Sequence, residues 1–152
     1  MAETLGSLCD KLTIVKLKEW HTEDPSRLQS LAQQQQQLAQ EINGFVQSAF
    51  AGEIPPERLT FAANKVFKKQ GNEIAQVAGT MGEVFAQLAQ VNCELWHQQE
   101  KVYVFETVPT EEKDAVVKSL AKLNLQRNQC IDAIDRALLQ HISAQAEKDS
   151  LP

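Results

Sequence analysis

The chain has 152 residues, a hydrophobic content of 43% and a formal net charge of -5. This fits one domain over residues 1–152, with enough apolar side chains for a substantial core. The acidic balance excludes the clustered basic face of a nucleic-acid-binding protein and disfavours an anionic membrane surface. Short apolar runs predict no membrane insertion, and the first residues lack the pattern of a secretory leader. Three widely spaced cysteines indicate reduced thiols and a cytoplasmic protein.

Helical periodicity predicts a first helix over about residues 4–21 and a second over about 25–51. Asp24 is a good N-cap, and Pro25 fits the first turn, where its missing N–H costs nothing. The glutamine run 33–37 falls opposite the apolar stripe of the second helix, which indicates a solvated face. No segment alternates like a strand.

Pro55-Pro56 and Gly71 divide the middle of the chain, and they favour a short helix over about 57–69. Two long helices then follow, over about 73–106 and 110–147, with Ile74 and Val77 opening the apolar stripe of the first of them. A tight turn between long helices predicts an antiparallel hairpin. The predicted fold class is therefore all-α, an elongated antiparallel helical bundle of four main helices plus one short helix.

The first predicted helix is apolar on two sides. Leu8 and Leu12 belong to one stripe, whereas Leu17 and Trp20 belong to the opposite side. A helix of this kind is buried on both sides. It is either the central helix of the bundle or a face for a second subunit, and we expect an isologous homodimer or a protein partner.

Arg127 interrupts a leucine-rich stripe of the last helix. At ~100° per residue it lies near the centre of the stripe that contains Leu120, Leu123 and Ile131. A guanidinium does not lose its proton, so burial at this position demands a partner.

Two interpretations of Arg127 stay open. In the first, a buried polar network satisfies itself, for example through Arg127 with Asp10 or with a carboxylate on its own helix. In the second, the arginine helps to hold a small anionic metabolite, such as a sugar phosphate or a nucleotide sugar. The candidate ligand-binding residues are Asp10, Lys11, Trp20, Asn92, Trp96, Asn124, Arg127 and Asn128.

A Trp-His pair occurs twice, at Trp20-His21 and at Trp96-His97, with matching leucine and valine positions before it. This is either coincidence between amphipathic helices or a sign of two tryptophans around a shared pocket. Glu94 and His97 match one Glu-x-x-His unit of di-iron bundles, but a full site needs two units and further carboxylates. We therefore predict no metal site and no cofactor.

Three stretches resemble the signatures of an uncharacterised family of small helical bacterial proteins. They are Leu5–His21, Asn92–Trp96 and Leu123–Asp135. Genes of this family often lie near glycosyltransferases of surface-polysaccharide synthesis, so the resemblance implies a role there. No activity is assigned to the family. With no nucleophile motif or phosphate loop in the chain, we favour a non-catalytic bundle over an enzyme.

A local run, Ile131–Leu139, also resembles the Ile-Asp-x-Ile-Asp-x-x-Leu-Leu run that opens all-α chorismate mutases. Here the run lies near the end of the sequence, and the basic and acidic residues that bind substrate in those enzymes do not follow it. An amphipathic helix produces such a run easily.

Overall fold

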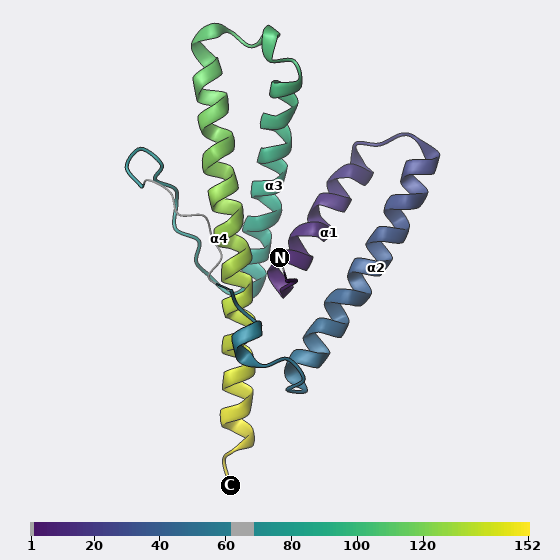
Figure 1. The fold of residues 1–152 in the computed structure, drawn as a ribbon, viewed down its shortest axis with the longest axis vertical. Helices are drawn as coiled ribbons and strands as arrows, with labels where there is room; N and C mark the ends of the chain where they lie inside the picture. Colours follow the sequence, from purple (N-terminus) through teal and green to yellow (C-terminus); the bar gives the residue numbers. More distant parts are fainter. Residues whose placement is uncertain (1, 62–68) are drawn as a thin grey trace.

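A computed structural model describes residues 2–61 and 69–152 and shows two helical hairpins that diverge like the arms of a V (Figure 1). The first hairpin consists of α1 (Leu5–Trp20) and α2 (Pro25–Phe50). The second consists of α3 (Met81–Tyr103) and α4 (Thr110–Asp149). Two 3-10 turns, η1 (Pro56–Arg58) and η2 (Phe105–Thr107), complete the described elements. The all-α fold class and its four main helices are confirmed.

Side-chain caps set the starts of the first three helices. The Thr4 hydroxyl accepts a hydrogen bond from the Ser7 N–H, and the Ser7 hydroxyl accepts one from the Thr4 N–H, which closes a capping box before α1. The Asp24 carboxylate accepts from the Arg27 N–H at 2.8 Å before α2, as its position next to Pro25 predicts.

The predicted start of the fourth helix at residue 73 is wrong, because α3 begins only at Met81. Gly79 has a φ of +132°, which a helix does not allow, and Thr80 forms a capping box with Glu83. Val77 nevertheless reaches the core, from an irregular segment instead of a helix.

The predicted short helix over 57–69 is also largely wrong where it can be checked. Only η1 is helical, residues 59–61 and 69 are not, and residues 62–68 lie outside the described part. Leu59 is 1% exposed and belongs to the core. Burial of Leu59 and Val77 ties the connection to the helices, and this tertiary burial overrides local helix propensity.

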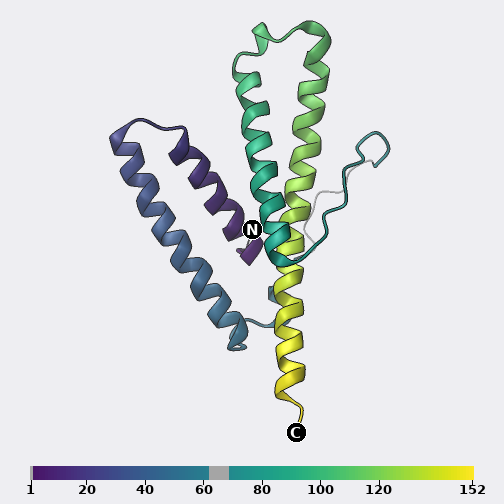
Figure 2. The ribbon, with the colours of Figure 1, turned by 180° about the vertical axis from the view of Figure 1, so that it is seen from behind.

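α1 is the central helix of the fold. It packs against α2 on one side and against α3 and α4 on the other, whereas α2 makes little contact with the second hairpin (Figure 2). This confirms the central-helix interpretation of the two apolar sides. The chain itself packs on both sides of α1, although Trp20 at the end of the helix is 85% exposed. The two apolar sides therefore no longer argue by themselves for a second subunit, and the homodimer stays a prediction.

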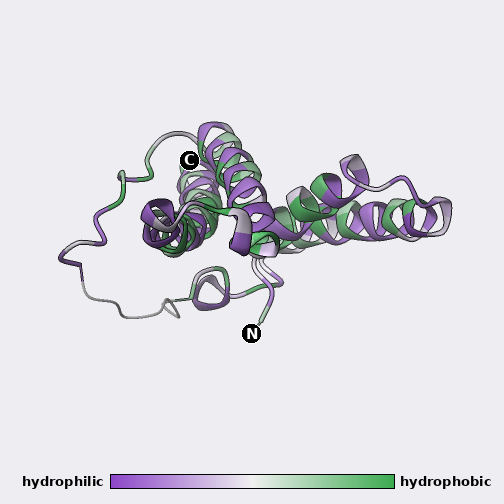
Figure 3. Cartoon of the chain, turned by 90° about the horizontal axis from the view of Figure 1, so that it is seen from above, coloured by the Kyte–Doolittle hydropathy of each residue, from purple (hydrophilic) through white to green (hydrophobic). Residues whose placement is uncertain are grey.

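The core lies near the base of the V, where α1, α3 and α4 meet. Residues 69–80, which lead into α3, reach the second hairpin from the side opposite α1 and α2 (Figure 3). The buried core cluster consists of Leu5, Cys9, Ala49, Leu59, Val77, Val84, Leu88, Cys130, Ile134 and Leu138. The core therefore holds together the elements on which the polar cluster described below is built.

The three cysteines are free thiols. Burial raises the pKa of both Cys9 and Cys130 to about 11, so these thiols stay protonated and behave as small apolar core residues. Cys93 is exposed on α3.

Candidate functional site

Asp10 is the centre of a polar cluster that links three helices. Its side chain is only 6% exposed. The Arg127 guanidinium binds the Asp10 carboxylate through two nitrogens: Nε donates to Oδ1 at 2.9 Å, and Nη2 donates to Oδ2. Asn92 Nδ2 on α3 donates to the same Oδ1 at 2.9 Å. The predicted network of Arg127 with Asp10 is therefore confirmed, and it ties α1 to both α3 and α4.

Thr13 extends this cluster by one turn of α1. Its hydroxyl donates to the Asp10 carbonyl at 2.8 Å and accepts from Asn92 Nδ2 at 2.7 Å. Asn92 is 1% exposed, and its Oδ1 has no hydrogen-bond partner among the described residues. A buried carbonyl oxygen without a donor costs free energy, so the cluster is not fully satisfied.

The ion pair uses two of the five N–H donors of the arginine. The hydrogen bond to Asp10 raises the pKa of Arg127 above its usual value, against the effect of burial. Two-pronged pairing of a guanidinium with a carboxylate is the geometry by which arginine would also bind an anionic ligand. Because Asp10 already occupies that position, the cluster serves to link α1 to α3 and α4.

A second polar contact fixes the beginning of α1 on α4. Asp135 Oδ1 accepts a hydrogen bond from the Gly6 N–H at 2.7 Å, in the first turn of α1 where backbone N–H groups lack helical partners. Burial raises the pKa of Asp135 to about 6, while hydrogen bonds from Gly6 and Thr4 act in the opposite direction. Asp135 is 4% exposed, so this carboxyl group lies inside the fold.

We expect the free energy of unfolding to depend on the protonation of Asp135. A carboxyl whose pKa is higher in the folded state binds more protons when folded, so stability falls as pH rises from about 4 to about 6 and then levels off. At ~1.4 kcal/mol per pKa unit and a shift of about two units, the loss is on the order of 3 kcal/mol. Asp135→Asn keeps an acceptor for the Gly6 N–H, and it should remove this dependence of stability on pH. At neutral pH the variant should be at least as stable as the wild type.

Urea unfolding of both proteins between pH 4 and 7 tests this expectation. The difference between the two stability curves isolates Asp135 from the other titrating groups. A constant difference across this range would contradict the prediction.

Two of the predicted site residues on α4 lie outside the cluster. Asn124 and Asn128 are both exposed, and Asn124 Nδ2 donates to the Leu120 carbonyl of its own helix at 3.1 Å. Their predicted placement at the core face is wrong. They lie about 60–100° around the helix from Arg127, which is far enough to turn them from α1 toward solvent.

The two tryptophans do not share a pocket. Trp20 is 85% exposed, whereas Trp96 stacks on His21 with ring centroids 4.6 Å apart and donates from Nε1 to Glu100 at 2.9 Å. The repeated Trp-His pair therefore brings His21 together with Trp96. His97 Nδ1 lies 3.7 Å from Glu100 Oε2 on the surface. The described residues include no group of three or more His, Cys, Asp or Glu side chains that could hold a metal ion.

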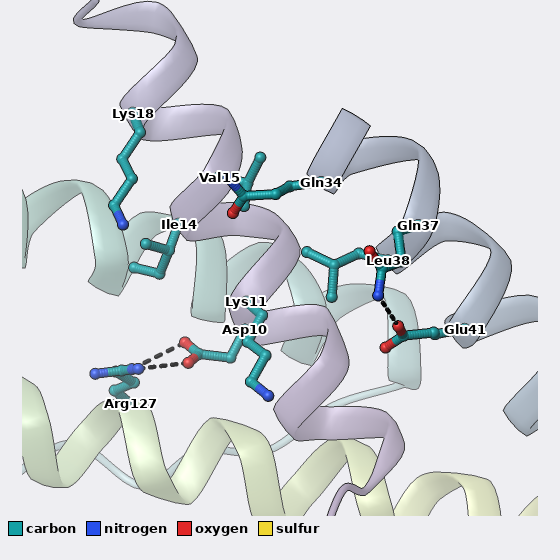
Figure 4. A pocket seen from close by; sticks show the side chains of 10 residues that line it. All are labelled: Asp10, Lys11, Ile14, Val15, Lys18, Gln34, Gln37, Leu38, Glu41 and Arg127. Atoms are coloured by element: carbon teal, nitrogen blue, oxygen red, sulfur yellow. Dashed lines mark hydrogen bonds and ion pairs between the residues drawn. The ribbon is translucent and has the colours of Figure 1, made fainter. Parts of the chain in front are cut away.

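A pocket of about 460 Å³ lies beside the cluster, between α1, α2 and α4 (Figure 4). The predicted residues Asp10, Lys11 and Arg127 line it. Gln34 and Gln37 from the glutamine run of α2 also line it, and both are exposed, as the predicted solvated face requires.

The helical pattern of the sequence predicts Asp135 at or beside the core face of the last helix, one turn after Ile131, and its burial confirms this. Gly6 and Thr13 were not predicted as members of the polar contacts. Gly6 had a weak signal, since a glycine in the first turn of an apolar helix can mark a close approach. Thr13 had none, because a threonine on a helix is ordinary.

No protein-family model, curated protein or solved structure matches the chain. The family resemblance thus stays a prediction. Across residues 2–61 and 69–152, every helix is too short or too polar to cross a lipid bilayer.

Proposed function

We propose that the protein acts without catalysis, as a module that binds an amphipathic helix of a partner protein at the two hairpin tips. The supporting observation is a pair of exposed aromatic side chains. α1 ends at Trp20, which is 85% exposed, and α3 ends at Tyr103, which is 77% exposed. Both helices end at the same end of the molecule (Figure 1).

Helical geometry assigns these aromatics to faces that α1 and α3 turn toward each other. Trp20 follows Thr13 by two turns, and Thr13 contacts Asn92 on α3. Tyr103 follows Trp96 by two turns, and Trp96 stacks on His21 at the end of α1. Trp20 thus lies one residue before the contact that His21 makes with α3, and Tyr103 lies two turns of α3 beyond that contact, with both aromatic side chains exposed to solvent. Exposed aromatics of this kind are enriched in protein interfaces.

Charge favours a partner with basic flanks. Residues 100–114, which surround the tip of the second hairpin, contain five acidic residues and two lysines. An apolar helix face with lysine or arginine at its edges complements this tip. The family resemblance adds the proposal that the partner belongs to surface-polysaccharide synthesis.

The test uses a synthetic amphipathic peptide with leucines on one face and lysines along its edges. We expect it to bind, measured by the fluorescence anisotropy of a dye attached to the peptide, and we expect Trp20→Ser and Tyr103→Ser each to weaken binding by roughly tenfold, as interface aromatics do. The matched control is Phe50→Ser, since Phe50 is 48% exposed at the far end of α2. A version of the peptide with glutamates at its edges should bind more weakly.

Three outcomes would overturn the proposal. The first is no binding of the lysine peptide, and the second is an equal effect of all three substitutions. The third is a concentration-dependent dimer, seen by sedimentation, that Trp20→Ser dissolves, because a second copy of the chain would then occupy the tips. This last result would instead support the predicted homodimer.

The alternative function is binding of a small anionic metabolite, and the pocket beside Arg127 is the observation that favours it. Since Asp10 occupies the inner edge of the guanidinium, a ligand would have to bind on the pocket side of the ion pair.

A further inference from the structure

We propose that the pocket between α1, α2 and α4 binds a phosphate monoester of a small polyhydroxylated molecule. Its volume of about 460 Å³ falls within the range of ~300–1,000 Å³ that is common for small-molecule sites. The inference deepens the alternative function proposed above and rests on it, and it is independent of partner binding because Trp20 does not line the pocket.

The cationic end of the pocket is formed by Lys18 and Arg127. Lys18 has no ion pair or hydrogen bond from its ammonium group among the described residues, and its side chain runs along Ile14 toward Arg127 (Figure 4). Asp10 balances the charge of Arg127, but one-third of the arginine side chain is still exposed. An anion bound there would meet an uncompensated ammonium and the remaining N–H groups of the guanidinium.

Lys11 supplies a second adjustable cation. Its ammonium pairs with Glu3, but both side chains are about half exposed, at 53% and 43%. An exposed ion pair of this kind contributes little to stability, so Lys11 is free to turn toward a phosphate.

The α2 wall supplies partners for hydroxyl groups. Gln37 Nε2 donates to Glu41 Oε1 at 2.8 Å, and Gln34 lies one turn earlier on the same helix. Amide and carboxylate oxygens accept hydrogen bonds from hydroxyls, and amide N–H groups donate to them. Glu41 would repel a phosphate at close range. Since it lies across the pocket from Lys18 (Figure 4), the ligand would bind with its phosphate toward Lys18 and its hydroxyls toward Glu41.

The lining also includes three apolar side chains, Ile14 and Val15 of α1 and Leu38 of α2. Such a surface suits the C–H face of a sugar or polyol ring. A free phosphate would use only the cationic end, so the pocket should prefer a phosphorylated sugar to inorganic phosphate.

The test is calorimetric titration of the protein with glucose 1-phosphate, inorganic phosphate and glucose as probes. We expect glucose 1-phosphate to bind more tightly than either of the others. Lys18→Gln should weaken its binding by roughly tenfold or more, as loss of a charge-assisted hydrogen bond does. Glu41→Gln should reduce the preference over inorganic phosphate.

Lys16→Gln is the matched control, because Lys16 lies two residues away on α1, is exposed, pairs with Glu19 and does not line the pocket. An equal loss with Lys16→Gln would show attraction by surface charge alone and would overturn the proposal. No heat of binding with glucose 1-phosphate, or equal affinities for it and inorganic phosphate, would also overturn it. Trp20→Ser should leave the titration unchanged, which separates this result from the test of partner binding.

Discussion

Gly6→Ala should destabilise the fold strongly, although alanine is the better helix former. A Cβ at Gly6 would lie 2.3 Å from the Ile131 carbonyl oxygen and 3.0 Å from Asp135 Oδ1. Neither α1 nor α4 can relieve such a clash by rotating a side chain, so the helix backbones must separate. Separation would also lengthen the hydrogen bond from Gly6 to Asp135. We expect a loss of roughly 3 kcal/mol in the free energy of unfolding, or about 10 °C in Tm.

Gly44→Ala is the matched control on α2. A Cβ at Gly44 meets no atom within 4 Å, and the residue lies inside a helix. The same substitution should therefore stabilise the protein there by about 0.5–1 kcal/mol, through helix propensity alone. Thermal unfolding of the two variants compares them directly. If both substitutions shifted Tm upward, the close approach of α1 to α4 at Gly6 would be refuted.

Local patterns were sufficient to predict most of the fold. Pro25 after Asp24 is a strong helix-start signal, and α2 begins where it indicates. Thr110, which the sequence predicts as the cap of the last helix, is instead its first helical residue and makes no cap hydrogen bond. The connection between α2 and α3 was mispredicted because its apolar residues have the spacing of a helix. In the structure, single residues of this connection are buried in the core, without a helical face around them. Leu59 and Val77 are each buried by distant helices, and no window of neighbouring residues contains that information.

The site was only partly predictable for a related reason. Arg127 stood out because a charged residue in an apolar stripe requires a partner, and Asp10 stood out for the same reason on the first helix. Which surfaces face each other depends on the V arrangement of the hairpins. The sequence therefore did not show that Trp20 lies in solvent, or that Gln34 and Gln37 share a pocket with Arg127.

Arg127→Leu should cost about 3 kcal/mol of unfolding free energy, because it leaves the Asp10 carboxylate buried with only neutral hydrogen-bond partners. We choose the lower end of the range for broken buried pairs, since one-third of the Arg127 side chain is exposed. Asp10→Asn should cost less, roughly 1–2 kcal/mol, because water can solvate the exposed part of the arginine that it leaves unpaired.

The double variant of Asp10→Asn with Arg127→Leu distinguishes a coupled pair from two independent residues. If the bidentate contact links α1 to α4, the double variant should be more stable than the sum of the single losses predicts, by about 2 kcal/mol. Arg136→Leu is a control on the exposed side of α4 and should change stability by less than about 0.5 kcal/mol. Additive losses would mean that the ion pair carries no mutual stabilisation. In that case a structural link between α1 and α4 would not explain why a guanidinium lies in this apolar stripe. The explanation would then have to come from the pocket that Arg127 lines.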